Sequence, residues 1–264
     1  MPNKKIIIKS VITVFAFVVV FTFLTKRNDI LPVSICQWGL HFEKENAAPV
    51  PNLEDSELNP HGAYYHGNLN KKVIYITFDA GYENGNTEPI LDALKKHNAP
   101  AAFFVVGPYI EHNPEIVKRM VEEGHVVGNH TYNHPDMTKK NQQEFMEQLV
   151  KTSNRYKNII GADMPLFYRP PEGKFSTENL EWAKQAGYTT VLWSSAYVDW
   201  NADDQPSHEY AFEKIKQRTF DGAIFLLHST SKTNAEILDS QLTKWEEMGY
   251  SFGDIRSLVS DYGG

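Results

Sequence analysis

Residues 73–81 read VIYITFDAG, an apolar run that ends in a carboxylate and a glycine. Val73 to Phe78 is predicted to be a buried strand, because the run is short, apolar and rich in β-branched and aromatic residues. Asp79 follows at the carboxyl end of this strand. The stretch therefore combines a buried strand with a polar residue at its end, and this combination recurs along the chain.

Strand and helix alternate about seven times after residue 72. The first helix is predicted over 87–97, since Ile90, Leu91 and Leu94 share one face and Pro89 fits the first turn. A capping box at Thr233 and Glu236 is expected to start the last helix. The alternation predicts an α/β fold with parallel strands and crossover helices, and the count fits a barrel or a doubly wound sheet. The other predicted strands are 101–106, 125–128, 166–168, 189–193, 223–227 and 250–252, and the other helices are 113–124, 142–159, 180–186 and 207–219.

Five ionisable residues stand at or just beyond the carboxyl ends of five different predicted strands. In α/β barrels that face carries the chemistry. The pattern therefore predicts one shared site built from Asp79, His130, Arg169, Asp199 and His228.

The segment HTYNH at 130–134 places two histidines four positions apart. This spacing lets two imidazoles bind one metal ion if the segment forms a tight turn or a helix. On this pattern alone His130 and His134 are candidate ligands, and surface histidines would show the same spacing.

Five motifs in order resemble the polysaccharide deacetylase family, the NodB-homology carbohydrate esterases. They are TFDAG (77–81), HTYNH (130–134), RPPEG (169–173), VDW (198–200) and FLLH (225–228). The resemblance covers about residues 60–262. It is nearest to the delta-lactam-biosynthetic (muramic-lactam) de-N-acetylases of spore formers, on the strength of TFDAGYENGNT (77–87), WGL (38–40) and AYY (63–65).

The resemblance implies a deformed (β/α) barrel of about seven parallel strands with an N-terminal extension. It also implies a divalent metal ion, with zinc as the first choice, and hydrolysis of an N-acetyl group on an amino sugar. An amide is a poor electrophile, so a metal that polarises the carbonyl and activates water suits this reaction.

The family roles carry over to individual positions. Asp79 would be the general base and Arg169 would hold it, while His228 would be the general acid, oriented by Asp199. The metal ligands would be His130 and His134. Substrate contacts are expected from Tyr82, Glu172 and Trp200, with a backbone N–H near Glu172 stabilising the oxyanion.

One position departs from the family pattern. The second acidic residue of the first motif, which supplies the third metal ligand, is Ala80 here. Alanine cannot bind a metal, so the ion is expected to be held weakly, with Glu83 or Asp79 as alternative ligands. The muramic-lactam subgroup shares this departure.

The leading functional prediction is a deacetylase that acts on N-acetylmuramic acid of peptidoglycan glycan strands, on the way to muramic delta-lactam in the spore cortex. The alternatives are an N-acetylglucosamine or chitin-oligosaccharide deacetylase, and a wall-glycan binding module without activity. A glycoside hydrolase is disfavoured, because it needs two carboxylates that flank the scissile bond.

The 264 residues carry a net charge of −7 and are 41% hydrophobic, a globular composition that argues against nucleic-acid binding. The single cysteine, Cys36, excludes an intrachain disulfide. No obligate protein partner is evident.

Residues 11–24 are uncharged and are flanked by lysines and an arginine, the pattern of a signal sequence or an uncleaved membrane anchor. We expect this signal or anchor at 1–25, a stalk and N-terminal extension at 26–69, and the deacetylase domain at 70–264. The chain beyond the segment is expected outside the cytoplasm, anchored to the membrane or secreted.

Overall fold

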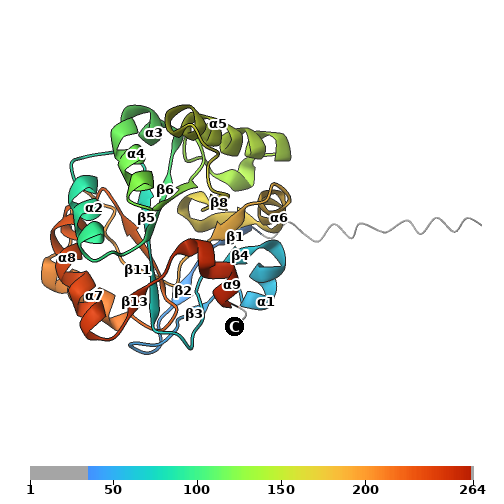
Figure 1. Cartoon of the computed structure of the whole chain (residues 1–264). Coiled ribbons are helices and arrows are strands. Elements are labelled where there is room, and N and C mark those ends of the chain that lie inside the picture. The colour runs from blue at the N-terminus through green and yellow to red at the C-terminus, as the bar shows by residue number, and fades with distance from the viewer. Residues whose placement is uncertain (1–34, 263–264) are drawn as a thin grey trace, which may run out of the picture. The chain divides into compact units, whose positions relative to one another are not determined.

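The strand that carries Asp79 lies inside a nine-stranded sheet in the computed structural model, which describes residues 35–262 (Figure 1). The order is β11-β12-β5-β6-β7-β8-β10-β4, with β13 beside β5. Every ladder in this sheet is parallel. The strands are β4 (Ala63–Tyr64), β5 (Val73–Ala80), β6 (Ala101–Val105), β7 (Val126–Asn129), β8 (Phe167–Tyr168), β10 (Thr189–Val191), β11 (Ser195–Ala196), β12 (Ile224–His228) and β13 (Ser251–Phe252).

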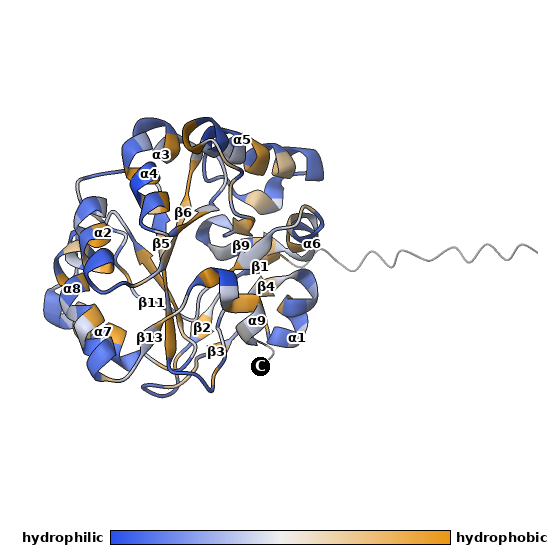
Figure 2. Cartoon of the chain, in the orientation of Figure 1, coloured by the Kyte–Doolittle hydropathy of each residue, from blue (hydrophilic) through white to orange (hydrophobic). Residues whose placement is uncertain are grey.

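Helices cover the outer side of the sheet, except for the C-terminal helix, which packs on the interior side; this half-barrel agrees with the predicted deformed (β/α) barrel, with nine strands where about seven were predicted (Figure 1). Their apolar stripes face the strands, and Figure 2 shows blue, hydrophilic residues on their outer surfaces. The helices are α1 (Asp55–Leu58), α2 (Thr87–Lys96), α3 (Gly107–His112), α4 (Pro114–Glu122), α5 (Gln142–Ile160), α6 (Thr177–Gln185), α7 (His208–Gln217), α8 (Lys232–Glu247) and α9 (Leu258–Tyr262).

The two faces of β5 enter two different parts of the core. Ile76, Phe78 and Ala80 belong to the cluster that packs against the outer helices. Tyr75 belongs to the interior cluster, which also contains Leu258 from the C-terminal helix α9. Because side chains alternate along a strand, this arrangement turns Asp79 toward the interior.

The part of the N-terminal extension that the structure describes, residues 35–69, packs into the same folded unit as the domain that follows. Strand β1 (Ile35–Gln37) pairs antiparallel with β9 (Lys174–Ser176), and β2 (Leu40–His41) pairs with β3 (Val50–Pro51). Strand β4 joins the main sheet beside β10. The expected boundary between 69 and 70 therefore does not divide two folding units. Strands before it are hydrogen-bonded to strands after it, and aromatic residues from both sides share one buried cluster.

Several local elements of the predicted strand–helix region differ from the sequence-based expectation. Helix α3 and strand β11 were not predicted, because both are short and their sequences carry no clear periodicity. Helix α8 begins at Lys232, and the Ser231 side chain caps it by accepting a hydrogen bond from the Asn234 N–H at 3.1 Å. The capping box predicted at Thr233 and Glu236 is wrong, because Glu236 instead contacts His208.

The apolar segment 11–24 lies outside the described residues, so its prediction as a signal or anchor stays a prediction. Among residues 35–262, no helix combines the length and the apolar character needed to cross a bilayer.

Candidate active site

A cavity of about 760 Å³ opens at the carboxyl ends of the parallel strands. It lies on the face that the sequence predicted to carry the chemistry. Two of the predicted site residues, Arg169 and Asp199, are buried behind the cavity wall. The other seven line it: Asp79, Tyr82, His130, His134, Glu172, Trp200 and His228.

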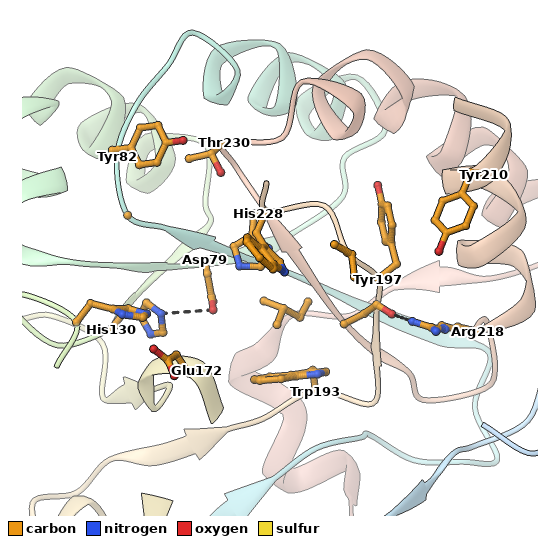
Figure 3. Close-up of a pocket in the computed structure, with 16 residues that line it drawn as sticks. Asp79, Tyr82, His130, Glu172, Trp193, Tyr197, Tyr210, Arg218, His228 and Thr230 are labelled. Atoms are coloured by element: carbon orange, nitrogen blue, oxygen red, sulfur yellow. Dashed lines mark hydrogen bonds and ion pairs between the residues drawn. The ribbon is translucent and has the colours of Figure 1, made fainter. Parts of the chain in front are cut away.

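Asp79 and His228 are direct neighbours across β5 and β12, where their Cα atoms are paired in register. Side chains at paired positions point to the same face of a sheet. Both therefore reach into the same cavity, as Figure 3 shows. Each of the two side chains is held from behind by a different buried residue.

Arg169 holds Asp79. Its guanidinium is fully buried, and Nη1 donates to Asp79 Oδ1 at 2.9 Å. Nη2 donates to Thr77 Oγ1 at 2.8 Å, and Nε donates to the Val191 carbonyl at 2.9 Å. The guanidinium carbon lies 4.2 Å from the centre of the Phe104 ring, so the cation is also packed against an aromatic face.

Asp199 holds His228. Its Oδ1 accepts a hydrogen bond from His228 Nδ1 at 2.7 Å, and its Oδ2 accepts one from the His228 backbone N–H at 2.8 Å. Asn234 Nδ2 donates to the same Oδ2 at 2.6 Å. The carboxylate fixes both the ring and its tautomer, so that Nε2 of His228 is the nitrogen left for the cavity.

These environments shift the two pKa values in opposite directions. Burial alone would raise the pKa of Asp79, but electrostatic interactions with His130, Arg169 and His228, together with the Arg169 hydrogen bond, hold it below its usual range. Burial alone would lower the pKa of His228, but the charge and hydrogen bond of Asp199 raise it above the ordinary value. An ionised carboxylate thus faces a protonatable imidazole, the arrangement expected of a base and an acid.

His130 presents its Nε2 atom to the cavity, because its Nδ1–H donates to the Arg169 carbonyl at 2.9 Å. Burial lowers the pKa of His130 to about 4, so the ring is neutral at neutral pH. The His134 ring lies beside it, with 4.9 Å between ring centres, on a turn where His134 has a φ of 56°.

These donors fit a divalent cation. The lone pair of His130 Nε2 faces Asp79 Oδ2 at 3.4 Å, and two acceptors at that distance repel each other unless a proton or a cation lies near both. Two neutral imidazoles are suitable ligands for zinc. Among residues 35–262, however, no group of three or more histidine, cysteine or acidic side chains is arranged to hold a metal by itself.

Neither Ala80 nor Glu83 completes the ligand set. Ala80 is fully buried in the helix-facing core, on the opposite side of β5 from Asp79. Glu83 Oε1 accepts a hydrogen bond from the Gly85 N–H at 2.6 Å, and its Oε2 accepts one from the Tyr109 hydroxyl at 3.0 Å. Glu83 therefore shapes the loop after β5, and it does not line the cavity in this structure.

Aromatic side chains form much of the remaining cavity wall. Tyr82 and Trp200 are more than half exposed at the rim, where flat apolar surfaces can stack on sugar rings. The sequence did not single out Trp193 and Tyr197, which also line the cavity (Figure 3). Both residues come shortly before the VDW motif, and this position is the sequence signal that could have identified them as cavity residues. The turn that follows Arg169 contributes Glu172 to the cavity wall. The backbone of Glu172 is left-handed there, with a φ of 55°.

Comparison with known proteins supports this description. Residues 66–191 match the family model for polysaccharide deacetylases. The chain is 38% identical to the peptidoglycan-N-acetylmuramic acid deacetylase PdaA of Bacillus subtilis, over 88% of this chain and 89% of that one. A peptidoglycan-N-acetylglucosamine deacetylase of Bacillus cereus is 35% identical, over 74% of this chain and 70% of that one.

The solved structure of Bacillus subtilis PdaA, a family 4 carbohydrate esterase, is similar to this fold with a TM-score of 0.83. The identity is 39%, and the match covers 87% of this chain and 98% of that one. The resemblance in fold thus extends through the N-terminal strands as well as the motif-bearing core.

The buried ion pair yields a stability prediction. Arg169→Gln should destabilise the protein by about 3 to 5 kcal/mol, because the Asp79 carboxylate is left buried without its cation. Urea denaturation followed by far-ultraviolet circular dichroism measures the free energy of unfolding.

The matched control is Arg155→Gln. Arg155 pairs with Glu111 at 2.6 Å, but its side chain is 45% exposed, so its loss should change stability by about 1 kcal/mol or less. Equal losses in the two variants would show that the Arg169–Asp79 pair contributes no more than a surface contact.

Proposed function

The chain belongs to the polysaccharide deacetylase family, which hydrolyses N-acetyl groups, and we propose that its substrate is the N-acetylmuramic acid of peptidoglycan. One observation carries the reaction: Asp79 and His228 share one cavity, with buried partners that hold one ionised and the other protonatable. The similarity to the muramic acid deacetylase of Bacillus subtilis supports the choice of sugar.

Asp79 takes the proton from the attacking water, and Arg169 keeps the carboxylate ionised and oriented. The amide carbonyl then becomes an anionic tetrahedral intermediate, which needs a positive or hydrogen-bonding neighbour. His228 donates a proton from Nε2 to the leaving nitrogen, since an amine leaves readily only when protonated. Asp199 keeps the imidazole oriented for that transfer. The products are acetate and a free amine on the sugar.

A divalent metal ion, zinc in the first instance, would be held by His130 and His134. When bound, it would polarise the carbonyl and lower the pKa of water. The remaining coordination positions would be left to Asp79, water or substrate, because Ala80 and Glu83 do not line the cavity whereas Asp79 Oδ2 lies 3.4 Å from His130 Nε2.

The setting follows from the substrate. Peptidoglycan lies outside the cytoplasmic membrane, so the 11–24 segment would export the chain or anchor it there. The freed amine sits next to the lactyl carboxylate of muramic acid, and closure of these two groups gives the muramic delta-lactam of spore cortex in a later step.

Acetate release from peptidoglycan stripped of its stem peptides tests the function directly. Mass spectrometry of the sugars then identifies the one that lost 42 mass units as an acetyl group. Loss from muramic acid supports the proposal. Loss from glucosamine alone, or glycan binding without acetate release, would replace it with one of the two alternative functions.

In the same assay, Asp79→Asn should lower kcat about 10²- to 10⁴-fold, because an amide cannot accept the proton from water. The variant keeps the size and shape of the side chain, and its circular dichroism spectrum should match that of the parent. Acetate release at the parent rate by a folded variant would remove Asp79 from the mechanism.

Asp199→Asn should move the alkaline limb of the kcat/KM profile to lower pH. Asp199 raises the pKa of His228, and the acid must be protonated, so activity falls as pH rises through that pKa. Without the charge, the pKa and the limb move down together. A profile that overlays the parent's would show that Asp199 does not tune the acid.

Zinc binding tests the two histidines. His130→Ala should weaken the affinity for added Zn²⁺ at least about tenfold in a calorimetric titration, because it removes one of two fixed donors. His208→Ala is the matched control, since His208 lies on the surface and pairs with Glu236. Equal affinity in the parent and both variants would place any metal elsewhere.

A further inference from the structure

One cation in the cavity wall is not used by the proposed reaction. Arg218 lines the cavity and lies at the end away from Asp79 and His228, with Trp193 and Tyr197 between (Figure 3). It follows directly after helix α7, and its backbone carbonyl accepts a hydrogen bond from Ser195 Oγ at 2.6 Å. The base of the side chain is therefore fixed.

The other charged groups of the cavity have counter-charges. Arg169 neutralises Asp79, and His228 neutralises Asp199 when protonated. Glu172 pairs with Lys174 at 2.5 Å. No acidic side chain among residues 35–262 forms an ion pair with Arg218, although its side chain is half-buried. The cavity thus presents one cation whose charge is not balanced by the protein.

The contacts of Arg218 leave most of its donors available. One face of the guanidinium lies over the Phe42 ring, at 4.3 Å from the centre, and Nη1 donates to the Ala196 carbonyl. A guanidinium has five N–H donors in one plane, and stacking does not use them. The Tyr210 ring lies at the same end of the cavity, and Figure 3 shows its hydroxyl on the side of Arg218.

We propose that Arg218 binds a carboxylate of the peptidoglycan strand, at a subsite separate from the hydrolysed N-acetyl group. Arginine binds carboxylates with paired, charge-assisted hydrogen bonds, and the low polarity of the surrounding aromatic wall strengthens them. This inference rests on the proposed peptidoglycan substrate. It makes Arg218 a determinant of specificity rather than of the chemical step.

Two groups on such a strand offer the carboxylate. Muramic acid carries a lactyl carboxylate where the stem peptide has been removed, and the stem peptide carries its own carboxylates where it remains. Strands of N-acetylglucosamine alone carry neither. A carboxylate-binding arginine would therefore favour muramic-containing strands over chitin-like ones.

The experiment compares KM for stripped glycan strands with KM for the same strands after methyl esterification. In the parent, esterification should raise KM about 10- to 100-fold, which corresponds to the loss of one charge-assisted hydrogen-bonding interaction. Arg218→Gln should raise KM for the free-acid strands by a similar factor and should show little further response to esterification. In both cases KM should change more than kcat.

Two further variants distinguish a role of Arg218 in substrate binding from a role in supporting the cavity wall. Arg218→Lys keeps the charge and should recover part of the affinity. Phe42→Leu removes the stacked ring but keeps the guanidinium, so its response to esterification should remain close to the parent's. A second set of strands that still carry stem peptides shows which of the two carboxylates is bound.

The proposal is overturned if esterification leaves the KM of the parent enzyme unchanged in both sets of strands. A loss of stability in Arg218→Gln without any change in the esterification response would leave Arg218 a purely structural residue. Acetate release by the parent is measured in the same assay. Failure of the proposed function, with no release at all, is therefore distinguished from failure of the Arg218 subsite.

Discussion

The buried ion pair between Arg169 and Asp79 is the contact on which the site depends. Arg169 reaches across the interior of the half-barrel, from the end of β8 to the carboxylate of β5 and to the carbonyl of Val191 on β10. A buried cation without a partner is costly, so Arg169 is stable in the interior only together with Asp79, and the curved sheet brings the two side chains together. The same contact that orients the proposed base therefore also requires the curvature of the sheet.

The base and the acid are neighbours, yet each has its own support. Asp79 is held by Arg169, whereas His228 is held by Asp199 and by Asn234, which donates both to Asp199 and to the His228 carbonyl. The hydrogen-bond partners are different, and the two charges also favour each other, so the carboxylate stays ionised while the imidazole favours its protonated form. One cavity can thus accept a proton from water and deliver one to an amine without either group changing its surroundings.

The N-terminal strands form part of the cavity wall. Gln37 Nε2 donates to the Glu172 carbonyl at 2.5 Å, and Trp38 Nε1 donates to the Trp193 carbonyl at 2.9 Å. Phe42 stacks on Arg218. The segment therefore braces three positions of the wall, of which only Glu172 belongs to one of the five motifs. This role explains why Trp38 is buried and Phe42 is half-buried, although the proline content and lack of periodicity of the segment are typical of a linker.

The sequence by itself determined the alternation of strands and helices, and it placed Asp79, His130, Arg169, Asp199 and His228 at strand ends. Periodicity and local turn signals carry that information, because they depend on residues a few positions apart. The pairing of Asp199 with His228 was predicted from the family resemblance, because their spacing in the sequence does not indicate it.

Only the tertiary structure decided which of these groups meet. It set the register of Asp79 opposite His228, turned Ala80 into the core and Glu83 into a loop, and brought Phe42 to Arg218. The contacts that build the site join residues far apart in the chain: Arg169 and Asp79 are 90 positions apart, and Asp199 and His228 are 29 positions apart. A local pattern reports which side chains are buried, but strand order and curvature of the whole sheet determine their partners.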